Sequence, residues 1–235
     1  MSASSIRVAL VEDHTLLAQS LVFALSAEGF DATIVRPPTT GDAMSLLPTI
    51  RAARPQVVLL DLDLGPAGDS APLIGPLQDA GCQVVVVTGV TQRTRWGECL
   101  ARGACTVLPK SAPLDAIAAT VRTVVAGGTV MAPAQAHDLV REWEASRRQH
   151  QNVDARFDRL TSREESILAA LLAGQRVRNI AAEWFVAEST VRSQVKSILA
   201  KLGVTSQIAA VAMARDAGWQ PSAAQPVRRS RTAAS

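Results

Sequence analysis

The feature that most constrains this chain is a five-fold alternation of short apolar runs with amphipathic stretches between residues 6 and 126. The apolar runs predict strands at Ile6–Val11, Ala32–Val35, Gln56–Leu60, Gln83–Thr88 and Cys105–Leu108. The stretches that follow them predict helices at 14–28, 42–53, 70–80, 92–102 and 113–126. Continuous runs of Val and Leu are typical of strands buried on both faces. We therefore expect an α/β domain with a doubly wound, five-stranded parallel sheet, whose ligand site lies at the carboxyl ends of the strands.

Polar residues follow four of these predicted strands, at the edge where the ligand site is expected. They are Glu12, Asp13, Asp61, Asp63, Thr88 and Lys110. Carboxylates this close together need a counter-charge, and all-oxygen ligands select Mg²⁺ or Mn²⁺. Asp61 is then a candidate nucleophile for phosphoryl transfer, with Thr88 and Lys110 holding phosphoryl oxygens. Taken singly, each residue is more often a cap, turn or surface residue, but four strands deliver the required types to one edge.

Four motifs in this region resemble those of the receiver domain of two-component response regulators. They are Val11-Glu12-Asp13, Val57-Val58-Leu59-Leu60-Asp61, Val86-Val87-Thr88-Gly89, and Gly103-Ala104 followed by Leu108-Pro109-Lys110. The resemblance implies a flavodoxin-like fold in which Asp61 accepts phosphate from a sensor histidine kinase. It also implies a metal site formed by Glu12, Asp13, Asp61 and the backbone carbonyl of Asp63, with Asp13 as a direct ligand. One departure is Val107, which stands where the family commonly has an aromatic switch residue.

The same residues also allow a second interpretation, in which the chain is an enzyme. Leu60-Asp61-Leu62-Asp63 resembles the D-x-D motif of haloacid-dehalogenase-type phosphatases. That class places its D-x-D strand near the start of the domain and an acidic pair after its lysine. Here the acidic pair comes first and none follows Lys110 nearby. We therefore favour the receiver, whose output is binding, and do not predict an enzyme.

Residues 156–219 predict an all-α domain of four helices. A capping box formed by Thr161 and Glu164 opens the first helix and Gly174 ends it, and further helices are predicted at 178–184, 188–202 and 205–217. The third helix has one apolar stripe, made of Val191, Val195, Ile198, Leu199 and Leu202. Its candidate DNA contacts are Ser189, Thr190, Arg192, Ser193 and Lys196. Charge pattern alone favours a solvated helix face over a DNA contact.

The motifs of this region resemble the LuxR-type helix-turn-helix domain over nearly all of 158–217. They are Leu160-Thr161-Ser162-Arg163-Glu164, Leu172-Ala173-Gly174, Ile180-Ala181, Ser189-Thr190-Val191-Arg192 and Ile198–Val204. A receiver followed by this domain is the architecture of NarL/FixJ-like response regulators. The resemblance implies binding to promoter DNA as a homodimer on paired half-sites. Ala187 and Gln194 depart from the family, which often has a capping Ser and a His there.

The chain is thus expected to contain four segments. They are a receiver at 5–126, a linker at 127–155 with a helix at Pro133–Gln149, a helix-turn-helix domain at 156–219 and a disordered basic tail at 220–235. Residues 1–127 carry two more acidic than basic residues, whereas residues 128–235 carry five more basic than acidic residues. This asymmetry places polyanion binding in the second half.

The lengths of the apolar runs and the spacing of the cysteines indicate the subcellular location of the protein. No apolar run approaches the ~20 residues of a membrane span, and the N-terminus lacks an apolar signal core. The three cysteines lack C-x-x-C spacing and indicate free thiols in a reducing compartment. We expect a cytoplasmic protein with no membrane partner. A receiver that works without phosphate, as a plain dimerisation module, is the alternative, and the presence of Asp61, Thr88 and Lys110 argues against it.

Overall fold

The computed structural model describes residues 5–222 of the chain. The contacts divide the chain into two compact units, with the boundary between Ser146 and Arg147, and each unit is described by itself. The predicted basic tail, 220–235, lies outside the described residues except at 220–222.

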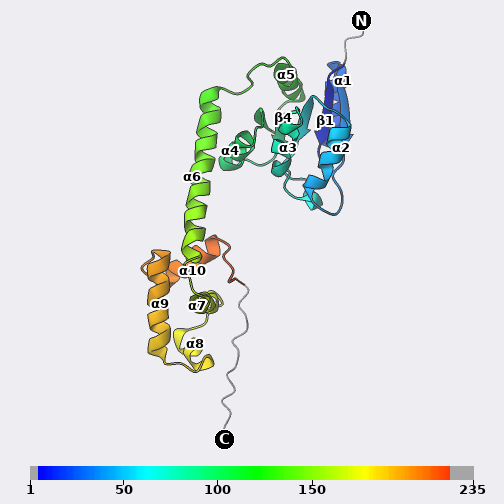
Figure 1. The fold of residues 1–235 in the computed structure, drawn as a ribbon. Helices are drawn as coiled ribbons and strands as arrows, with labels where there is room; N and C mark the ends of the chain where they lie inside the picture. The colour runs from blue at the N-terminus through cyan, green and yellow to red at the C-terminus, as the bar shows by residue number, and fades with distance from the viewer. Residues whose placement is uncertain (1–4, 223–235) are drawn as a thin grey trace. The chain divides into compact units, whose positions relative to one another are not determined.

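The first unit is built on one five-stranded parallel sheet (Figure 1). Its strands are β1 (Arg7–Val11), β2 (Asp31–Val35), β3 (Val57–Leu60), β4 (Gln83–Thr88) and β5 (Thr106–Pro109). They lie in the order β2-β1-β3-β4-β5, and all four neighbouring pairs are parallel. The predicted doubly wound sheet is therefore confirmed. The direction of winding reverses between β1 and β3, which is where ligand sites form in sheets of this order.

Helices cover both faces of this sheet. They are α1 (Thr15–Ala27), α2 (Leu47–Ala52), α3 (Ile74–Asp79), α4 (Arg93–Ala101) and α5 (Leu114–Val125). Alternate strand residues point to opposite faces, so Val8 and Leu10 pack in one core with residues of α1 and α5. Ala9 and Val11 pack in the other core with residues of α2, α3 and α4. The strands are buried from both sides because each face has its own layer of helices.

Two helices begin later than predicted. Short 3-10 turns at Ala43–Leu46 and Ala71–Leu73 precede α2 and α3, and a third lies at Gly65–Ala67. Pro48 occupies the first turn of α2 and Pro72 lies in the turn before α3. Proline has no N–H to donate and is accommodated in the first turn of a helix, so the regular helix starts close to each proline.

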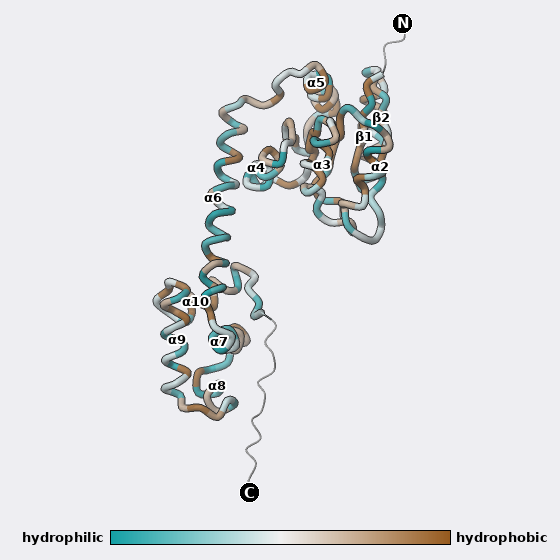
Figure 2. Tube along the Cα trace, viewed as in Figure 1, coloured by the Kyte–Doolittle hydropathy of each residue, from teal (hydrophilic) through white to brown (hydrophobic). Residues whose placement is uncertain are grey.

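Helix α6 (Pro133–Phe157) runs from the first unit into the second and is longer than predicted. The prediction ended it at Gln149. Its residues are mostly hydrophilic (Figure 2), which suits a helix between two units. The extra turns have a physical cause, since Val153 and Phe157 belong to the core of the second unit and no Gly or Pro interrupts the chain between them.

The second unit packs the end of α6 with four further helices. These are α7 (Ser162–Leu172), α8 (Val177–Glu183), α9 (Glu188–Leu202) and α10 (Gln207–Asp216). Its core includes Ile167, Ile180, Val191 and Ile198, and Phe157 stacks on Trp219 with ring centroids 5.4 Å apart. The predicted capping box of Thr161 and Glu164 is present.

No single helix within residues 5–222 is long and apolar enough to cross a membrane. The bent pair α9 and α10 passes by length and composition only, and both helices bury residues in the core of the second unit.

Candidate phosphoryl-transfer site and nucleic-acid interface

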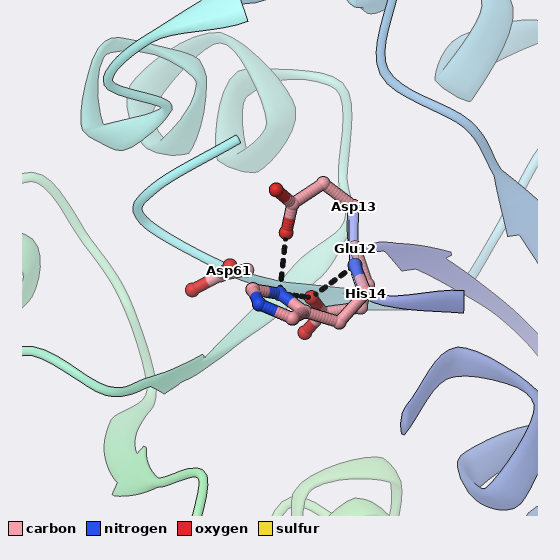
Figure 3. Close-up of side chains that lie close together, drawn as sticks. All are labelled: Glu12, Asp13, His14 and Asp61. Atoms are coloured by element: carbon pink, nitrogen blue, oxygen red, sulfur yellow. Dashed lines mark hydrogen bonds and ion pairs between the residues drawn. The ribbon is translucent and has the colours of Figure 1, made fainter. Parts of the chain in front are cut away.

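Three predicted acidic residues meet at the carboxyl ends of β1 and β3 (Figure 3). Glu12 and Asp13 follow β1, and Asp61 follows β3, where its backbone N–H donates to Val11 O. The side chain of Asp61 is almost wholly buried, as is that of Glu12, whereas Asp13 is exposed. Ligand atoms of these three residues and of His14 all lie within 4.8 Å of one another. The described residues therefore offer an acidic pocket suited to a divalent cation.

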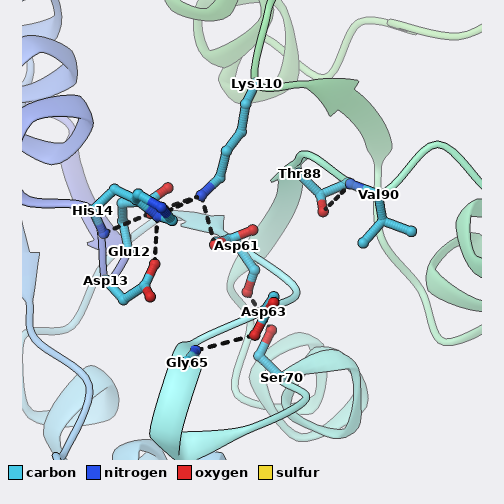
Figure 4. A network of polar contacts seen from close by, with 10 residues as sticks. All are labelled: Glu12, Asp13, His14, Asp61, Asp63, Gly65, Ser70, Thr88, Val90 and Lys110. Carbon is cyan, nitrogen blue, oxygen red and sulfur yellow. Dashed lines mark hydrogen bonds and ion pairs between the residues drawn. The ribbon is translucent and has the colours of Figure 1, made fainter.

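Lys110 joins the two buried carboxylates (Figure 4). Its Nζ donates to Oδ2 of Asp61 at 2.7 Å and to Oε1 of Glu12 at 2.8 Å. The lysine follows β5, and its backbone N–H donates to Thr88 O. Burial lowers the pKa of Lys110, but the hydrogen bonds to Asp61 and Glu12 outweigh it and leave that pKa raised. Burial raises the pKa of Asp61, and the hydrogen bond from Lys110 opposes that change. The lysine thus stays charged beside the carboxylate that it orients.

His14 also belongs to this pocket, and the sequence analysis did not single it out. Its Nδ1 lies 2.7 Å from Oδ1 of Asp13 and 3.0 Å from Oε1 of Glu12, and the ring is drawn between those carboxylates in Figure 3. The hydrogen bond to Glu12 raises the pKa of His14, and Asp13 adds to that effect. The sequence signal that could have identified His14 was its position directly after Glu12 and Asp13.

Thr88 is buried at the end of β4, and the contacts of its hydroxyl stay within its own loop. The hydroxyl oxygen accepts a hydrogen bond from the Val90 N–H at 3.1 Å. That contact uses the oxygen as an acceptor and leaves the hydroxyl proton able to be donated elsewhere.

Asp63 is exposed, and its side chain accepts a hydrogen bond from the Gly65 N–H at 3.1 Å. Its side chain therefore holds the turn that follows β3. Buried Ser70 donates its hydroxyl to the backbone carbonyl of Asp61, closing the loop from the other side (Figure 4). Ser70 lies nine residues beyond Asp61, and no sequence pattern marks it.

The charges of the acidic pocket and the cavity beside it indicate what the pocket can bind. Three carboxylates face one lysine and one histidine, so the pocket favours a further positive charge. The donor atoms are mainly hard carboxylate oxygens, which fit Mg²⁺ or Mn²⁺. A cavity of 340 Å³ opens beside Glu12 and Asp13, with Arg36 also in its lining. This cavity gives access to the two carboxylates that follow β1, whereas Asp61, Thr88 and Lys110 are not part of its lining.

In the second unit, α9 separates its apolar and polar residues as predicted. Val191, Val195 and Ile198 are buried in the core. The five candidate DNA contacts are exposed; they are Ser189, Thr190, Arg192, Ser193 and Lys196. Arg192 makes a solvent-exposed ion pair with Glu188 at 2.5 Å. Ala187 is the N-cap residue and provides no side-chain cap. The hydroxyl and basic groups are thus presented along one exposed face of the helix.

A buried ionic cluster fixes α9 against α7. Glu164 accepts hydrogen bonds from Nζ of Lys201 at 2.6 Å, from Oγ of Ser197 at 2.6 Å and from the backbone N–H of Thr161 at 2.8 Å. Burial raises the pKa of Glu164, but these hydrogen bonds outweigh it and lower the pKa to about 2. The sequence analysis identified the capping box but not its link to α9, because Ser197 and Lys201 lie more than thirty residues away.

Known proteins resemble both units. A family model described as "Bacterial regulatory proteins, luxR family" matches residues 158–214. The probable transcriptional regulatory protein NarL of Mycobacterium tuberculosis is 30% identical over 89% of this chain and 93% of its own length. The transcriptional regulatory protein DesR of Bacillus subtilis is 26% identical over 91% of this chain and 98% of its own length. The crystal structure of the response regulator ChrA, from a heme-sensing two-component system, is 28% identical in sequence and has a TM-score of 0.44. The match covers 91% of this chain and 98% of the ChrA chain.

Proposed function

This chain belongs to the NarL/FixJ-like two-component response regulators with a LuxR-type helix-turn-helix domain, and we propose that phosphorylation of Asp61 controls its binding to promoter DNA. The observation that carries the proposal is the contact of Lys110 with both Asp61 and Glu12 at the β1/β3 edge. A buried carboxylate beside a fixed lysine and an acidic pocket is an arrangement that supports an aspartyl phosphate. The exposed basic face of α9 supports the DNA-binding output.

In the phosphoryl transfer, a carboxylate oxygen of Asp61 attacks the phosphorus of a phosphohistidine in the sensor kinase. The new O–P bond forms as the P–N bond breaks, and the imidazole of the kinase is the leaving group. Lys110 holds Asp61 before the reaction and pairs with a phosphoryl oxygen after it. The Thr88 hydroxyl donates to another phosphoryl oxygen, since its present contact leaves that proton free to be donated.

A magnesium or manganese ion fits the donor set of this pocket. Glu12, Asp13, Asp61 and the backbone carbonyl of Asp63 would hold it, and the bound ion supplies charge neutralisation for the phosphoryl oxygens. His14 keeps the carboxylates of Glu12 and Asp13 close together through its Nδ1. Within this proposal the protein is a binding protein and not an enzyme, because its output is occupancy of DNA rather than turnover of a substrate.

The active form in this proposal is a homodimer in the cytoplasm, where promoter DNA and the kinase phosphohistidine are both accessible. Two exposed apolar side chains on α1 support self-association, because Leu16 and Phe23 are 80% and 79% exposed. Two copies would then place two α9 helices on paired half-sites of one duplex.

The chemistry is tested by phosphorylating the full chain with a small phosphodonor in the presence of Mg²⁺. Wild-type protein is expected to gain one base-labile phosphate by intact-mass spectrometry. Asp61→Asn is expected to gain none, because the neutral amide is a poor nucleophile. Asp63→Asn is the matched control and keeps labelling, since the amide oxygen can still accept the Gly65 N–H.

Equal labelling of Asp61→Asn would contradict the proposal and move the acceptor elsewhere. DNA affinity is measured on the same samples, using a duplex that wild-type protein selects from a random pool. The phosphorylated wild type is expected to bind that duplex more tightly than the unphosphorylated protein. Affinity that is identical with and without the phosphate would favour a receiver that works as a phosphate-independent dimerisation module.

A further inference from the structure

The turn between α8 and α9 contains a residue that neither the core nor the proposed contacts explain. Phe185 is 95% exposed, more than any other large hydrophobic side chain among residues 5–222. Its φ of 54° lies in the left-handed region. Arg54 is the other non-glycine residue with a positive φ in the described part of the chain. Bulky side chains rarely adopt this conformation, so Phe185 is unfavourable here in both solvation and backbone conformation.

The backbone requirement at this position has a clear cause. Trp184 is the C-cap residue of α8, so Phe185 is the first residue beyond the helix. The N–H of Phe185 donates to Ala182 O, and the N–H of Val186 donates to Ala181 O, which satisfies the last carbonyls of α8. A left-handed residue is the usual way to end a helix in this manner, and Gly or Asn normally occupies it. A sequence optimised for the stability of this turn would not have Phe there.

The position of the turn points to what the ring contacts. Phe185 lies three residues before Glu188, which begins α9, and the exposed Ser189 and Thr190 follow at once. In helix-turn-helix domains the first helix crosses the nucleic-acid backbone while the start of the second enters the major groove. The turn that joins them therefore lies beside the sugars and phosphates at the edge of the groove. The phenyl ring of Phe185 is uncharged and cannot form an ion pair with a phosphate. It can pack against the C–H groups of a deoxyribose at that position.

We infer that Phe185 is a DNA-contacting residue whose ring packs against deoxyribose at the edge of the major groove. Removing the ring from water on binding offsets the unfavourable exposure that it has in the free protein. Strained backbone retained beside a binding surface is consistent with a functional role. The inference rests on the proposed DNA-binding role of α9, and it extends the contact surface to a residue without charge or hydrogen-bonding groups.

The test compares Phe185→Asn with wild type in the full chain. Two duplexes of about 30 base pairs serve as probes, one selected by the wild type and one of mixed sequence. Phe185→Asn is expected to weaken binding to both duplexes about tenfold, because the lost contact is apolar and independent of sequence. The dependence of affinity on salt is expected to stay unchanged, since a deoxyribose contact releases no counterions.

A second readout separates a contact residue from a structural one. Hydrogen exchange of the free protein is expected to be equal or slower in α8 and α9 of Phe185→Asn, because Asn tolerates the left-handed conformation. Phe185→Leu keeps an apolar side chain and is expected to retain most of the affinity. Arg54→Asn relieves the other positive-φ residue, far from α9 in the sequence, and is the control that leaves DNA affinity unchanged.

Three results would overturn the inference. Undiminished DNA affinity in Phe185→Asn would assign the ring to another partner. Faster exchange in α8 and α9 together with weaker binding would make Phe185 a structural residue. A loss confined to the selected duplex would indicate contact with a base rather than a sugar. Failure of the proposed function looks different, because Arg192→Ala and Lys196→Ala would then also leave DNA binding intact.

Discussion

At the scale of residues, two buried carboxylates that are both paired with a lysine have pKa values shifted in opposite directions by their surroundings. Glu164 accepts hydrogen bonds from Lys201, Ser197 and Thr161, which together outweigh burial and lower its pKa. Asp61 receives a side-chain hydrogen bond from Lys110, and burial dominates, so its pKa is raised. Because Glu164 accepts hydrogen bonds from the N-cap residue of α7 and from residues of α9, it is suited to holding the two helices together, and we call this cluster the clamp. Asp61 accepts a hydrogen bond from one lysine at Oδ2, and our proposal assigns the phosphoryl chemistry to it.

The clamp gives a prediction about stability. Glu164→Gln is expected to destabilise the second unit by about 3 kcal/mol, because it leaves Lys201 without its buried partner. Urea unfolding of the full chain, with hydrogen exchange assigning the transition to α7 and α9, measures the change. Asp158→Asn removes an exposed carboxylate of the same unit and should have little effect. A loss as small as that of the control would show that the cluster is not a clamp.

The same residue predicts a pH dependence. The folded pKa of Glu164 is about 2, below its ordinary value of 4.5. The carboxylate therefore stabilises the fold fully above the ordinary pKa, and that stabilisation is lost as the pH falls from about 5 toward 2. Hydrogen exchange in α7 and α9 should accelerate over that range in wild type. Glu164→Gln should lack this part of the acid sensitivity.

Sequence reasoning located the pocket residues that follow strands, for a definite reason. Glu12, Asp13 and Asp61 follow buried strands, and parallel strands bring their carboxyl ends to one edge. His14 and Ser70 were missed. Ser70 reaches Asp61 through a loop whose path depends on local turns, and such turns leave no periodic signal in the sequence.

At the scale of elements, strands and buried helix stripes were the most predictable features. The sheet follows from continuous apolar runs, and the inner face of α9 follows from its helical spacing. Helix ends were harder, because α2 and α3 begin after 3-10 turns and α6 continues to Phe157. In the case of α6, the stabilising contacts come from the core of the second unit and are absent from the local sequence.

The exposed face of α9 carries the prediction about DNA. Arg192→Ala and Lys196→Ala are each expected to weaken specific binding by roughly 1–3 kcal/mol if they contact bases. If they contact phosphates, the loss should be similar on all sequences, with a shallower dependence on salt. Fluorescence anisotropy on selected and mixed-sequence duplexes distinguishes the two cases. Arg215→Ala on α10 is a control of equal charge, and unchanged affinity in both α9 variants would remove this helix from the groove.

At the scale of the whole molecule, the question is how the proposed phosphorylation of Asp61 changes the parts of the protein that form the dimer and lead to the second unit. Val107 is buried at the usual aromatic position and has no ring to rotate. A different aromatic residue contacts the relevant loop, because Nε1 of Trp96 on α4 donates to Val90 O at 2.6 Å. The Val90 N–H in turn donates to Thr88 Oγ1. Movement of Thr88 toward a phosphoryl group would therefore displace a loop that is tied to α4.

Within the first unit, α4 is also in close contact with the start of α6. Leu139 of α6 is fully buried, and a Cβ added to Gly97 of α4 would lie 2.1 Å from the Leu139 carbonyl oxygen. Arg93 of α4 forms an ion pair with Glu142 of α6 at 2.8 Å. A displacement of α4 thus acts on the helix that leads out of the unit. This route uses a loop and a helix contact in place of an aromatic rotation.

A switch of this kind is expected to be modest. Without a ring moving into the space that Thr88 vacates, the coupling of phosphorylation to dimerisation should fall toward the low end of the ~1–3 kcal/mol range of allosteric pairs. Sedimentation equilibrium of the full chain with and without phosphate at Asp61 measures it, and Asp61→Asn treated in the same way shows the background. Since that range ends at about 150-fold, a much larger shift in dimer affinity would show that the missing aromatic does not weaken the switch. An absent shift would mean that dimerisation in this protein does not depend on phosphate.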